Sequence, residues 1–155
     1  MFILKVTNIL KKHKIPYAIV GGHAVALHGA VRGTIDIDFI TNWNLKNLKL
    51  IEKALAEINL TPRLPINPED LFNFKEEYIK NKNLVAWNFI NINDPSEQID
   101  VVITHDLKKE SVKEIKIQGE FINIISKSGL IKMKKLSARE QDLIDIEALE
   151  RLDEK

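Results

Sequence analysis

Two aspartates separated by a single residue, Asp36 and Asp38, are the side chains in this sequence that most clearly point to chemistry. They lie in the run TIDIDFI at positions 34–40, whose alternating apolar residues predict a β-strand. Successive side chains of a strand point to opposite faces, so both carboxylates are expected on one face. Two such charges repel each other by about 1 to 4 kcal/mol at the effective dielectric near a protein surface. A bound divalent cation is the simplest reason to place them together.

A third carboxylate, Asp100, lies in a second apolar run, IDVVIT at positions 99–104. The sequence does not place this strand relative to the one at 34–40. If the two are neighbours, three carboxylates converge, and oxygen ligands of this kind suit Mg²⁺ or Mn²⁺. A pair of such ions can activate an attacking hydroxyl and stabilise the leaving oxygen in a displacement at phosphorus.

Two consecutive glycines, Gly21 and Gly22, follow an apolar strand at 17–20 and precede a short helix expected at 23–28. Backbone N–H groups at the start of a helix favour an anion, and a glycine has no side chain to obstruct a phosphate. The two glycines match neither a Walker loop nor a GxGxxG motif. They indicate a phosphate site only together with the aspartates on the next strand.

These residues must be positioned by a mixture of helices and strands, which makes the fold class α+β or mixed α/β. Helices are expected at 2–14, 23–28, 45–58, 68–80, from Ser126 or Ser128 to about 136, and at 139–152. Strands are expected at 17–20, 34–40, 84–92, 99–104, 112–117 and 121–125. The last four strands form two predicted hairpins, with turns at 93–96 and 118–119, and three prolines make 61–67 an irregular connection. The sequence shows no internal repeat or linker, so residues 1–155 are expected to form a single domain.

The composition excludes several classes of function. The chain has 155 residues with 45% hydrophobic and 29% charged residues, which is ordinary for a globular protein, and it has no cysteine for a thiolate nucleophile or a cysteine zinc site. A net charge of +1 gives no general attraction to nucleic acid. No apolar run is long enough for a signal peptide or membrane span, so a cytoplasmic protein without a membrane partner is expected.

Taken in order, the motifs resemble a known family. The residues GGHA at 21–24, then Gly29, Arg32, Thr34 and DID at 36–38, resemble the signature GG-x-A…R-x-T-x-D-[IL]-D of the nucleotidyltransferase superfamily, which has a polymerase-beta-like fold. The later run LIKMKKLSAREQDLIDIEAL resembles the closing segment of its AbiEii-like branch, the type IV toxin relatives. The resemblance implies a mixed β-sheet flanked by helices, with C-terminal helices over about 127–152.

The resemblance also implies a role for each matching residue. Asp36, Asp38 and Asp100 would ligate Mg²⁺ or Mn²⁺, and Asp100 would also be the possible general base. Lys134 would take part in catalysis. The residues implied to bind the nucleotide, an NTP such as ATP, are Gly21, Gly22, Arg32, Thr34 and Asp142.

Structural roles compete with several of these interpretations. The acids at 36, 38 and 100 could face solvent on their strands, and the two glycines could form only a tight turn. Arg32 could contact a phosphate or pair with an acid. Lys134 belongs to a lysine group that is typical of a solvated helix face, and Arg139, Asp142 and Asp145 could form a row of ion pairs.

The leading hypothesis is a metal-dependent nucleotidyltransferase that moves an NMP from an NTP to an acceptor and releases pyrophosphate. The acceptor stays open among RNA, a protein and a small hydroxylated compound such as an antibiotic. One alternative is an antibiotic-modifying nucleotidyltransferase. The other is a non-catalytic module of the same fold, which binds a nucleotide or is one half of a toxin–antitoxin pair with a partner protein.

Overall fold

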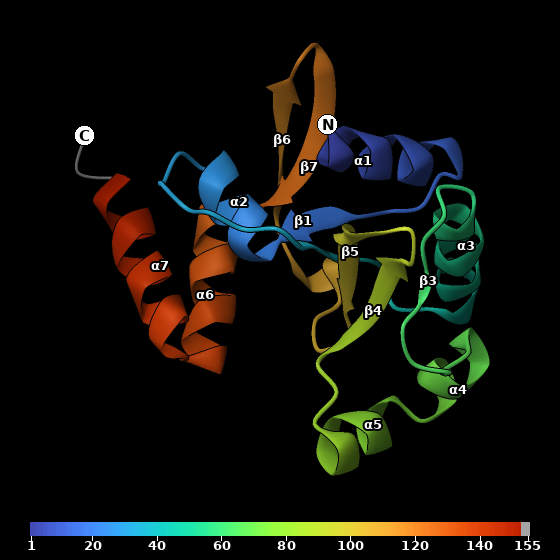
Figure 1. Ribbon diagram of the computed structural model, residues 1–155. Coiled ribbons are helices and arrows are strands. Elements are labelled where there is room, and N and C mark those ends of the chain that lie inside the picture. The colour runs from blue at the N-terminus through green and yellow to red at the C-terminus, as the bar shows by residue number, and fades with distance from the viewer. Residues whose placement is uncertain (153–155) are drawn as a thin grey trace.

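A single mixed β-sheet of seven strands runs through the computed structural model, which describes residues 1–152 (Figure 1). The strands are β1 (Ala18–Val20), β2 (Ile37–Ile40), β3 (Thr61–Pro62), β4 (Ala86–Asn91), β5 (Asp94–Val102), β6 (Val112–Ile117) and β7 (Glu120–Ile125). The helices are α1 (Phe2–Lys12), α2 (Gly21–Leu27), α3 (Leu45–Ala56), α4 (Pro68–Asn73), α5 (Lys75–Lys82), α6 (Lys127–Ser137) and α7 (Glu140–Arg151). Within residues 1–152, no helix is both long and apolar enough to cross a membrane.

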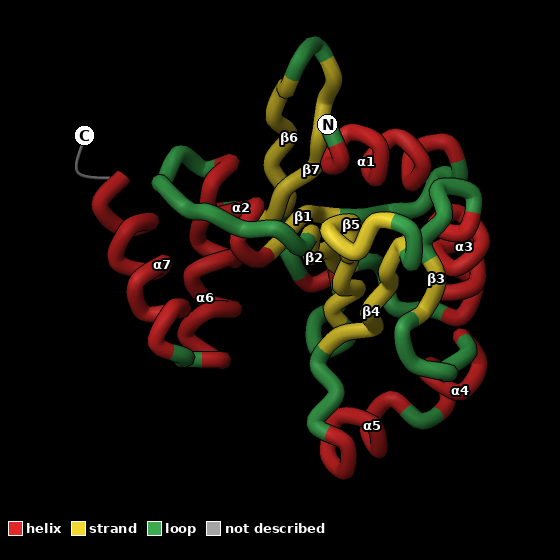
Figure 2. The backbone as a smooth tube through the Cα atoms, in the orientation of Figure 1, coloured by secondary structure: helices red, strands yellow, loops and turns green. Residues whose placement is uncertain are grey.

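The strand order is β3-β4-β5-β2-β1-β7-β6 (Figure 2). The pairs β2–β5 and β1–β7 are parallel, while the remaining neighbours are antiparallel. Strand β5 therefore lies directly beside β2, although some sixty residues separate them in the sequence. This neighbour relation is the step of the fold that brings the acidic residues together.

The alternation of side chains gives the centre of the sheet one apolar and one polar face. Trp87, Phe89 and Phe39 are almost fully buried on β4 and β2. Asn88, between Trp87 and Phe89 on β4, and Asp38, next to Phe39 on β2, are only partly buried. A core of apolar side chains thus fixes the strands, and the polar face stays open to a cleft.

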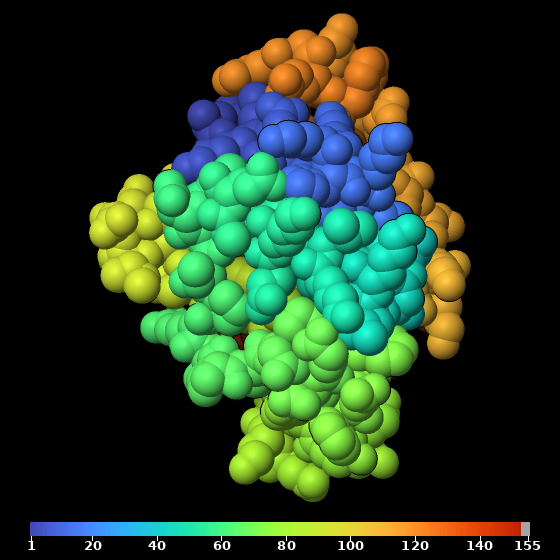
Figure 3. All heavy atoms as spheres, turned by 90° about the vertical axis from the view of Figure 1, so that its right-hand side faces the viewer, coloured from blue at the N-terminus to red at the C-terminus, as the bar shows by residue number. Residues whose placement is uncertain are grey.

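Helices α1 and α3 pack against each other on one side of the molecule, and α6 and α7 lie with α2 on the other (Figure 1). Figure 3 looks onto the first side, where α1, α3 and the segment of α4 and α5 cover most of the surface. Val6 and Leu10 of α1 and Leu48 of α3 are fully buried there, as their helical spacing predicts. Helix α6 begins at the cap Ser126, whose hydroxyl accepts a bond from Gly129 N at 3.1 Å.

Several predicted element boundaries differ from the structure. Helix α2 begins at Gly21 rather than at 23, so both glycines belong to it. Strand β2 begins only at Ile37, so Asp36 lies in the bend before it. The helix predicted over 68–80 is broken at Phe74, which has φ −120°, and α5 buries no residue that would hold the two halves in line. The connection 61–67 contains the short strand β3, and the first hairpin turns at 92–93 rather than 93–96 because β5 begins at Asp94. Both predicted hairpins are confirmed.

Candidate active site

Asp38 and Asp100 lie directly opposite each other on the parallel strands β2 and β5. Their side chains point to the same face of the sheet and share a hydrogen bond. Burial, followed by the charge of Asp100, raises the pKa of Asp38 from 3.8 to about 8. The two carboxylates therefore form one unit that holds a proton when no cation is near.

Asp36 belongs to the same electrostatic cluster, although it lies before the strand. Burial and then the charge of Asp100 raise its pKa, while Arg63 and His23 oppose the shift. Within residues 1–152, no three acidic, histidine or cysteine side chains are already grouped to hold a metal ion. The structure thus brings Asp38 and Asp100 into contact and leaves Asp36 at the edge of the pair.

The glycine step lies against these acids. Gly21 has φ +67°, and a Cβ built on it would be 1.9 Å from Oδ2 of Asp38. A Cβ on Gly22 would be 2.9 Å from Oγ1 of Thr34. Both glycines are therefore needed for close packing: Gly21 lets the backbone approach the carboxylate, and Gly22 lets the loop that carries Thr34 pack on α2.

A cleft of about 600 Å³ opens in front of the two aspartates. The sheet forms one wall, and α6 with the start of α7 forms the other. The lining residues are Val20, Gly21, Asp38, Val85, Ala86, Asp100, Val102, Thr104, His105, Leu130, Met133, Lys134, Leu136, Ser137, Arg139 and Asp142. Its volume is within the range of small-molecule sites.

The helical wall is held by a network of charges around two buried carboxylates, Asp142 and Asp145. Lys134, only 6% exposed, lies 2.8 Å from Oδ2 of Asp145 and 3.4 Å from Oδ1 of Asp142. Arg139 donates to Asp142 from Nε at 2.8 Å, which confirms the predicted ion pair between these residues. Arg32 donates from its Nε to Asp145 at 3.0 Å, so it joins the loop before β2 to α7.

The network keeps its two acids ionised. Burial opposes the charge of Asp142, yet hydrogen bonds from Arg139 and Ser137 hold its pKa well below the usual range. Burial likewise opposes the charge of Asp145, but the hydrogen bonds from Lys134 and Gln141 lower its pKa. The buried Lys134 and the more exposed Arg139 and Arg32 therefore neutralise the charge of the two buried carboxylates.

The structure sorts the predicted site residues into two groups. Those that border the space between sheet and helices are Gly21, Asp38, Asp100, Lys134 and Asp142. Those that are not among its lining residues are Gly22, Arg32, Thr34 and Asp36. Arg32 takes the second of its two predicted roles, since its partner is an acid. Lys134 is buried rather than solvated, because α7 places two carboxylates opposite it.

Four polar residues at the site were not predicted from the sequence, among them Ser137, which lines the cleft and donates to Asp142 at 2.7 Å. Asn88 of β4 donates to Asp100, and Thr104 and His105 line the cleft where β5 ends. Val102 and Thr104 lie two and four residues after Asp100. The alternation of side chains in the strand predicted at 99–104 therefore places both on the face of Asp100, although β5 itself ends at Val102. Burial lowers the pKa of His105, so this ring is neutral near pH 7.

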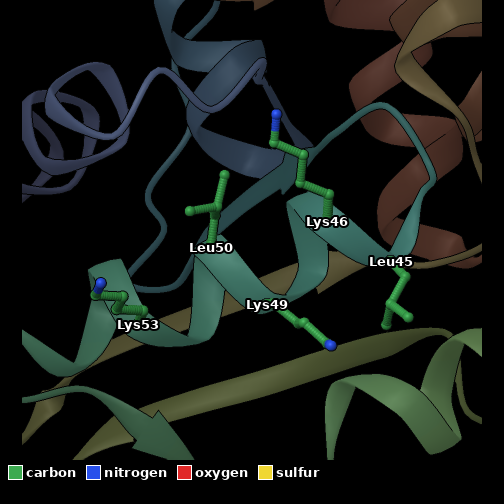
Figure 4. A pocket seen from close by; sticks show the side chains of 5 residues that line it. All are labelled: Leu45, Lys46, Lys49, Leu50 and Lys53. Atoms are coloured by element: carbon green, nitrogen blue, oxygen red, sulfur yellow. The ribbon is translucent and has the colours of Figure 1, made fainter.

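A second hollow, of about 440 Å³, lies on α3 and is unrelated to these acids. It is lined by Leu45, Lys46, Lys49, Leu50 and Lys53, and Figure 4 shows the three lysine side chains spreading in different directions. Lys49 is paired with Glu69 at 3.3 Å. The lysines do not converge on a common point, so this hollow is not a built anion site.

Of three comparisons with known proteins, only the one with solved structures finds a match. No family model matches the sequence, and the search of curated proteins finds no significant match. The solved structure of the lincosamide antibiotic adenylyltransferase LnuA, with lincomycin bound, is similar over 96% of this chain and 94% of that one, with 13% identity and a TM-score of 0.66. The antibiotic-resistance factor ANT(2'')-Ia matches over 96% and 80%, with 12% identity and a TM-score of 0.65.

An antigenic nucleotidyltransferase-like protein from Paracoccidioides brasiliensis matches over 97% of this chain and 73% of that one, with 16% identity and a TM-score of 0.62. All three neighbours resemble this chain over nearly its whole described length. The chain therefore has the nucleotidyltransferase fold, which confirms the fold implied by the motifs. At these identities the likeness concerns the fold, and the chemistry must be argued from the residues.

Proposed function

We propose that this chain is a metal-dependent nucleotidyltransferase that moves an NMP from an NTP to a hydroxyl acceptor and releases pyrophosphate. The observation that carries the proposal is the register of Asp38 with Asp100 on adjacent parallel strands, with the side-chain-free Gly21 beside Asp38. Such a pair has little structural value of its own, because two partly buried carboxylates in contact destabilise each other. The proposed domain is the whole chain, since one sheet runs through it and the C-terminal helices complete the cleft.

The donor chemistry of the site fits Mg²⁺ or Mn²⁺. Asp38 and Asp100 present carboxylate oxygens toward one cleft, and Asp36 is close enough for its pKa to respond to Asp100. These three residues would hold the metal, which supplies charge neutralisation for the phosphates when bound. The raised pKa of Asp38 supports the assignment, since a cation would replace the proton that the pair otherwise needs.

The remaining residues would bind and orient the reactants. The backbone of Gly21, which lines the cleft beside Asp38, would contact the triphosphate together with that of the adjacent Gly22. The carboxylate of Asp100 would take the proton of the acceptor hydroxyl. The oxygen of this hydroxyl then bonds to the α-phosphorus, and the bond from the α-phosphorus to the bridging oxygen breaks, which releases pyrophosphate. Lys134 and Asp142 would fix the helical wall, and through Asp145 they would hold Arg32 and the loop with Thr34.

The lining of the cleft favours a small organic acceptor over RNA. Its two lining cations, Lys134 and Arg139, are both paired with carboxylates, and the neutral His105 adds no charge. A phosphate backbone would need unpaired positive charge along its path. The lining also includes seven apolar residues, among them Val85 and Leu136, which are 61% and 75% exposed. An uncharged or weakly charged hydroxyl compound would cover this apolar surface.

Thermal melts with Mg²⁺ and each NTP test the nucleotide part of the proposal. Binding to the folded chain alone should stabilise it by about 2.7 kcal/mol at a ligand concentration 100 times Kd. The native chain should show this shift, and Asp38→Asn should not. Absence of a shift with every NTP would refute the proposal.

A further inference from the structure

A row of three polar side chains crosses the open face of the sheet. Asp38, Asp100 and Asn88 occupy the same register position on β2, β5 and β4. The Nδ2 group of Asn88 donates to Oδ1 of Asp100 at 2.8 Å and to the carbonyl oxygen of Ile99 at 3.3 Å. Asn88 thus contacts the acid pair from the side opposite β2.

The amide of Asn88 is held in one orientation by its neighbours. Both groups facing its nitrogen are acceptors, so turning the amide over would place its oxygen against a carboxylate and a carbonyl. The observed orientation leaves Oδ1 of Asn88 buried without a hydrogen-bond partner. A buried unpaired acceptor destabilises a protein, so the orientation of this amide costs stability and is set by its contact with Asp100.

We infer that Asn88 is a positioning residue for Asp100, an inference that rests on the proposed metal-dependent function. A carboxylate rotates easily about its terminal bond, because the torsion between an sp³ and an sp² carbon is broad. The amide of Asn88 ties down Oδ1 of Asp100 and so limits this rotation. The other carboxylate oxygen then keeps its direction relative to Asp38 and the cleft, which prepares the pair for a cation.

Mn²⁺ binding without any nucleotide tests this role, with Asn88→Leu as the variant. Leucine has nearly the same size and removes both the donor and the unpaired acceptor. Mn²⁺ affinity, measured by calorimetry, should fall about 10- to 100-fold, as for other groups that orient metal ligands. The thermal midpoint in EDTA should stay equal or rise, because the unpaired oxygen is gone. A structural role would instead lower the midpoint.

Asn91→Leu is the matched control on the same strand. Asn91 is 8% exposed, and it donates to Glu97 at 2.9 Å and accepts from Asn93 N at 3.0 Å. This variant should lose thermal stability and keep native Mn²⁺ affinity, the reverse of Asn88→Leu. If the leucine variant does not fold, Asn88→Ala carries the same comparison, and Asn88→Ser, which keeps a donor, should recover part of the affinity.

The outcomes separate the inference from the proposed function. Native Mn²⁺ affinity in a folded Asn88→Leu or Asn88→Ala chain would overturn the positioning role and leave the proposed function standing. A native chain that binds neither Mn²⁺ nor Mg²⁺ would overturn both. Weakened binding in the Asn88 variants, with native binding in Asn91→Leu, is the result that supports the inference.

Discussion

Gly21 is in contact with Asp38 so closely that no other residue fits: a Cβ at position 21 would be 1.9 Å from the carboxylate oxygen Oδ2. The start of α2 and the acid of β2 are therefore fixed together as one piece of the site. Whatever binds at Asp38 must also meet the backbone of Gly21. The contact with Asp38 explains why position 21 needs a glycine, which a tight turn alone would not explain.

Gly21→Ala should therefore lower the free energy of unfolding by more than the positive φ at this position alone would. An alanine with positive φ costs about 1 to 2 kcal/mol, and overpacking against Asp38 should add about 1 to 3 kcal/mol. Gly119→Ala is the matched control, because Gly119 has φ +83° with nothing within 4 Å of its Cβ position. Urea unfolding of both variants gives the comparison, and equal losses would show that the contact with Asp38 is not restrictive.

The metal-free protein should lose stability as the pH rises. The folded chain keeps a proton on Asp38, whose pKa is about 8, while the unfolded chain releases it near the ordinary value of 3.8. The contribution of this group is therefore fully present below its unfolded pKa and is lost as the pH rises through its folded pKa.

Urea unfolding in EDTA at about pH 5 and about pH 9 measures this effect in the native chain and in Asp38→Asn. The native chain should be less stable at the higher pH, and the variant should show a smaller difference. Added Mg²⁺ should stabilise the native chain more at the higher pH, because the metal requires the deprotonated carboxylate. The same pH dependence in both chains would contradict the assignment of the proton to Asp38.

Lys134→Met should destabilise the chain even without nucleotide. Lys134 is buried and pairs with Asp142 and Asp145, and removing one partner of a buried ion pair costs about 3 to 5 kcal/mol. Lys132→Met, on the exposed side of the same helix, is the control and should be close to neutral. If Lys134→Met were as stable as Lys132→Met, a role confined to the reaction would fit better than a structural one.

Leu136→Glu should weaken use of the acceptor and leave nucleotide binding intact. Leu136 lines the cleft and is 75% exposed, so a charged side chain there alters the apolar surface without disturbing the core. Leu143→Glu, at a 57% exposed position of α7 outside the cleft, is the control. The KM for the acceptor should rise in the first variant only. An unchanged KM would place the acceptor elsewhere.

Local patterns in the sequence predicted most elements but not how they meet. The strand with Asp100 was predicted from its apolar run, and the family resemblance implied the role of Asp100. Its place beside Asp38 depends on the parallel pairing of β2 with β5, which is a long-range contact. Neither a catalytic role nor a solvated helix face, the two interpretations of Lys134, anticipates its buried ion pairs, because the sequence of α6 does not show that Asp142 and Asp145 approach it from α7.

Asn88 shows the limit of reasoning from motifs. An asparagine in an apolar strand has many possible roles, and only the antiparallel register of β4 with β5 brings it to Asp100. The strand boundary at Ile37 is a similar case. The alternation of 34–40 continues through Asp36, but pairing with β1 and β5 begins after it, so the backbone bends there.

Transfer of a radiolabel from NTPs to a cell extract tests the central claim most directly. With Mg²⁺ and α-labelled NTPs, the native chain should place label in the small-molecule fraction, while γ-labelled NTPs should release labelled pyrophosphate and mark no acceptor. Asp38→Asn and Asp100→Asn should transfer nothing. Label in the RNA or protein fraction would correct the acceptor and keep the reaction. Transfer from the γ-labelled NTPs, or no transfer to any fraction with any NTP, would contradict nucleotidyl transfer by this chain.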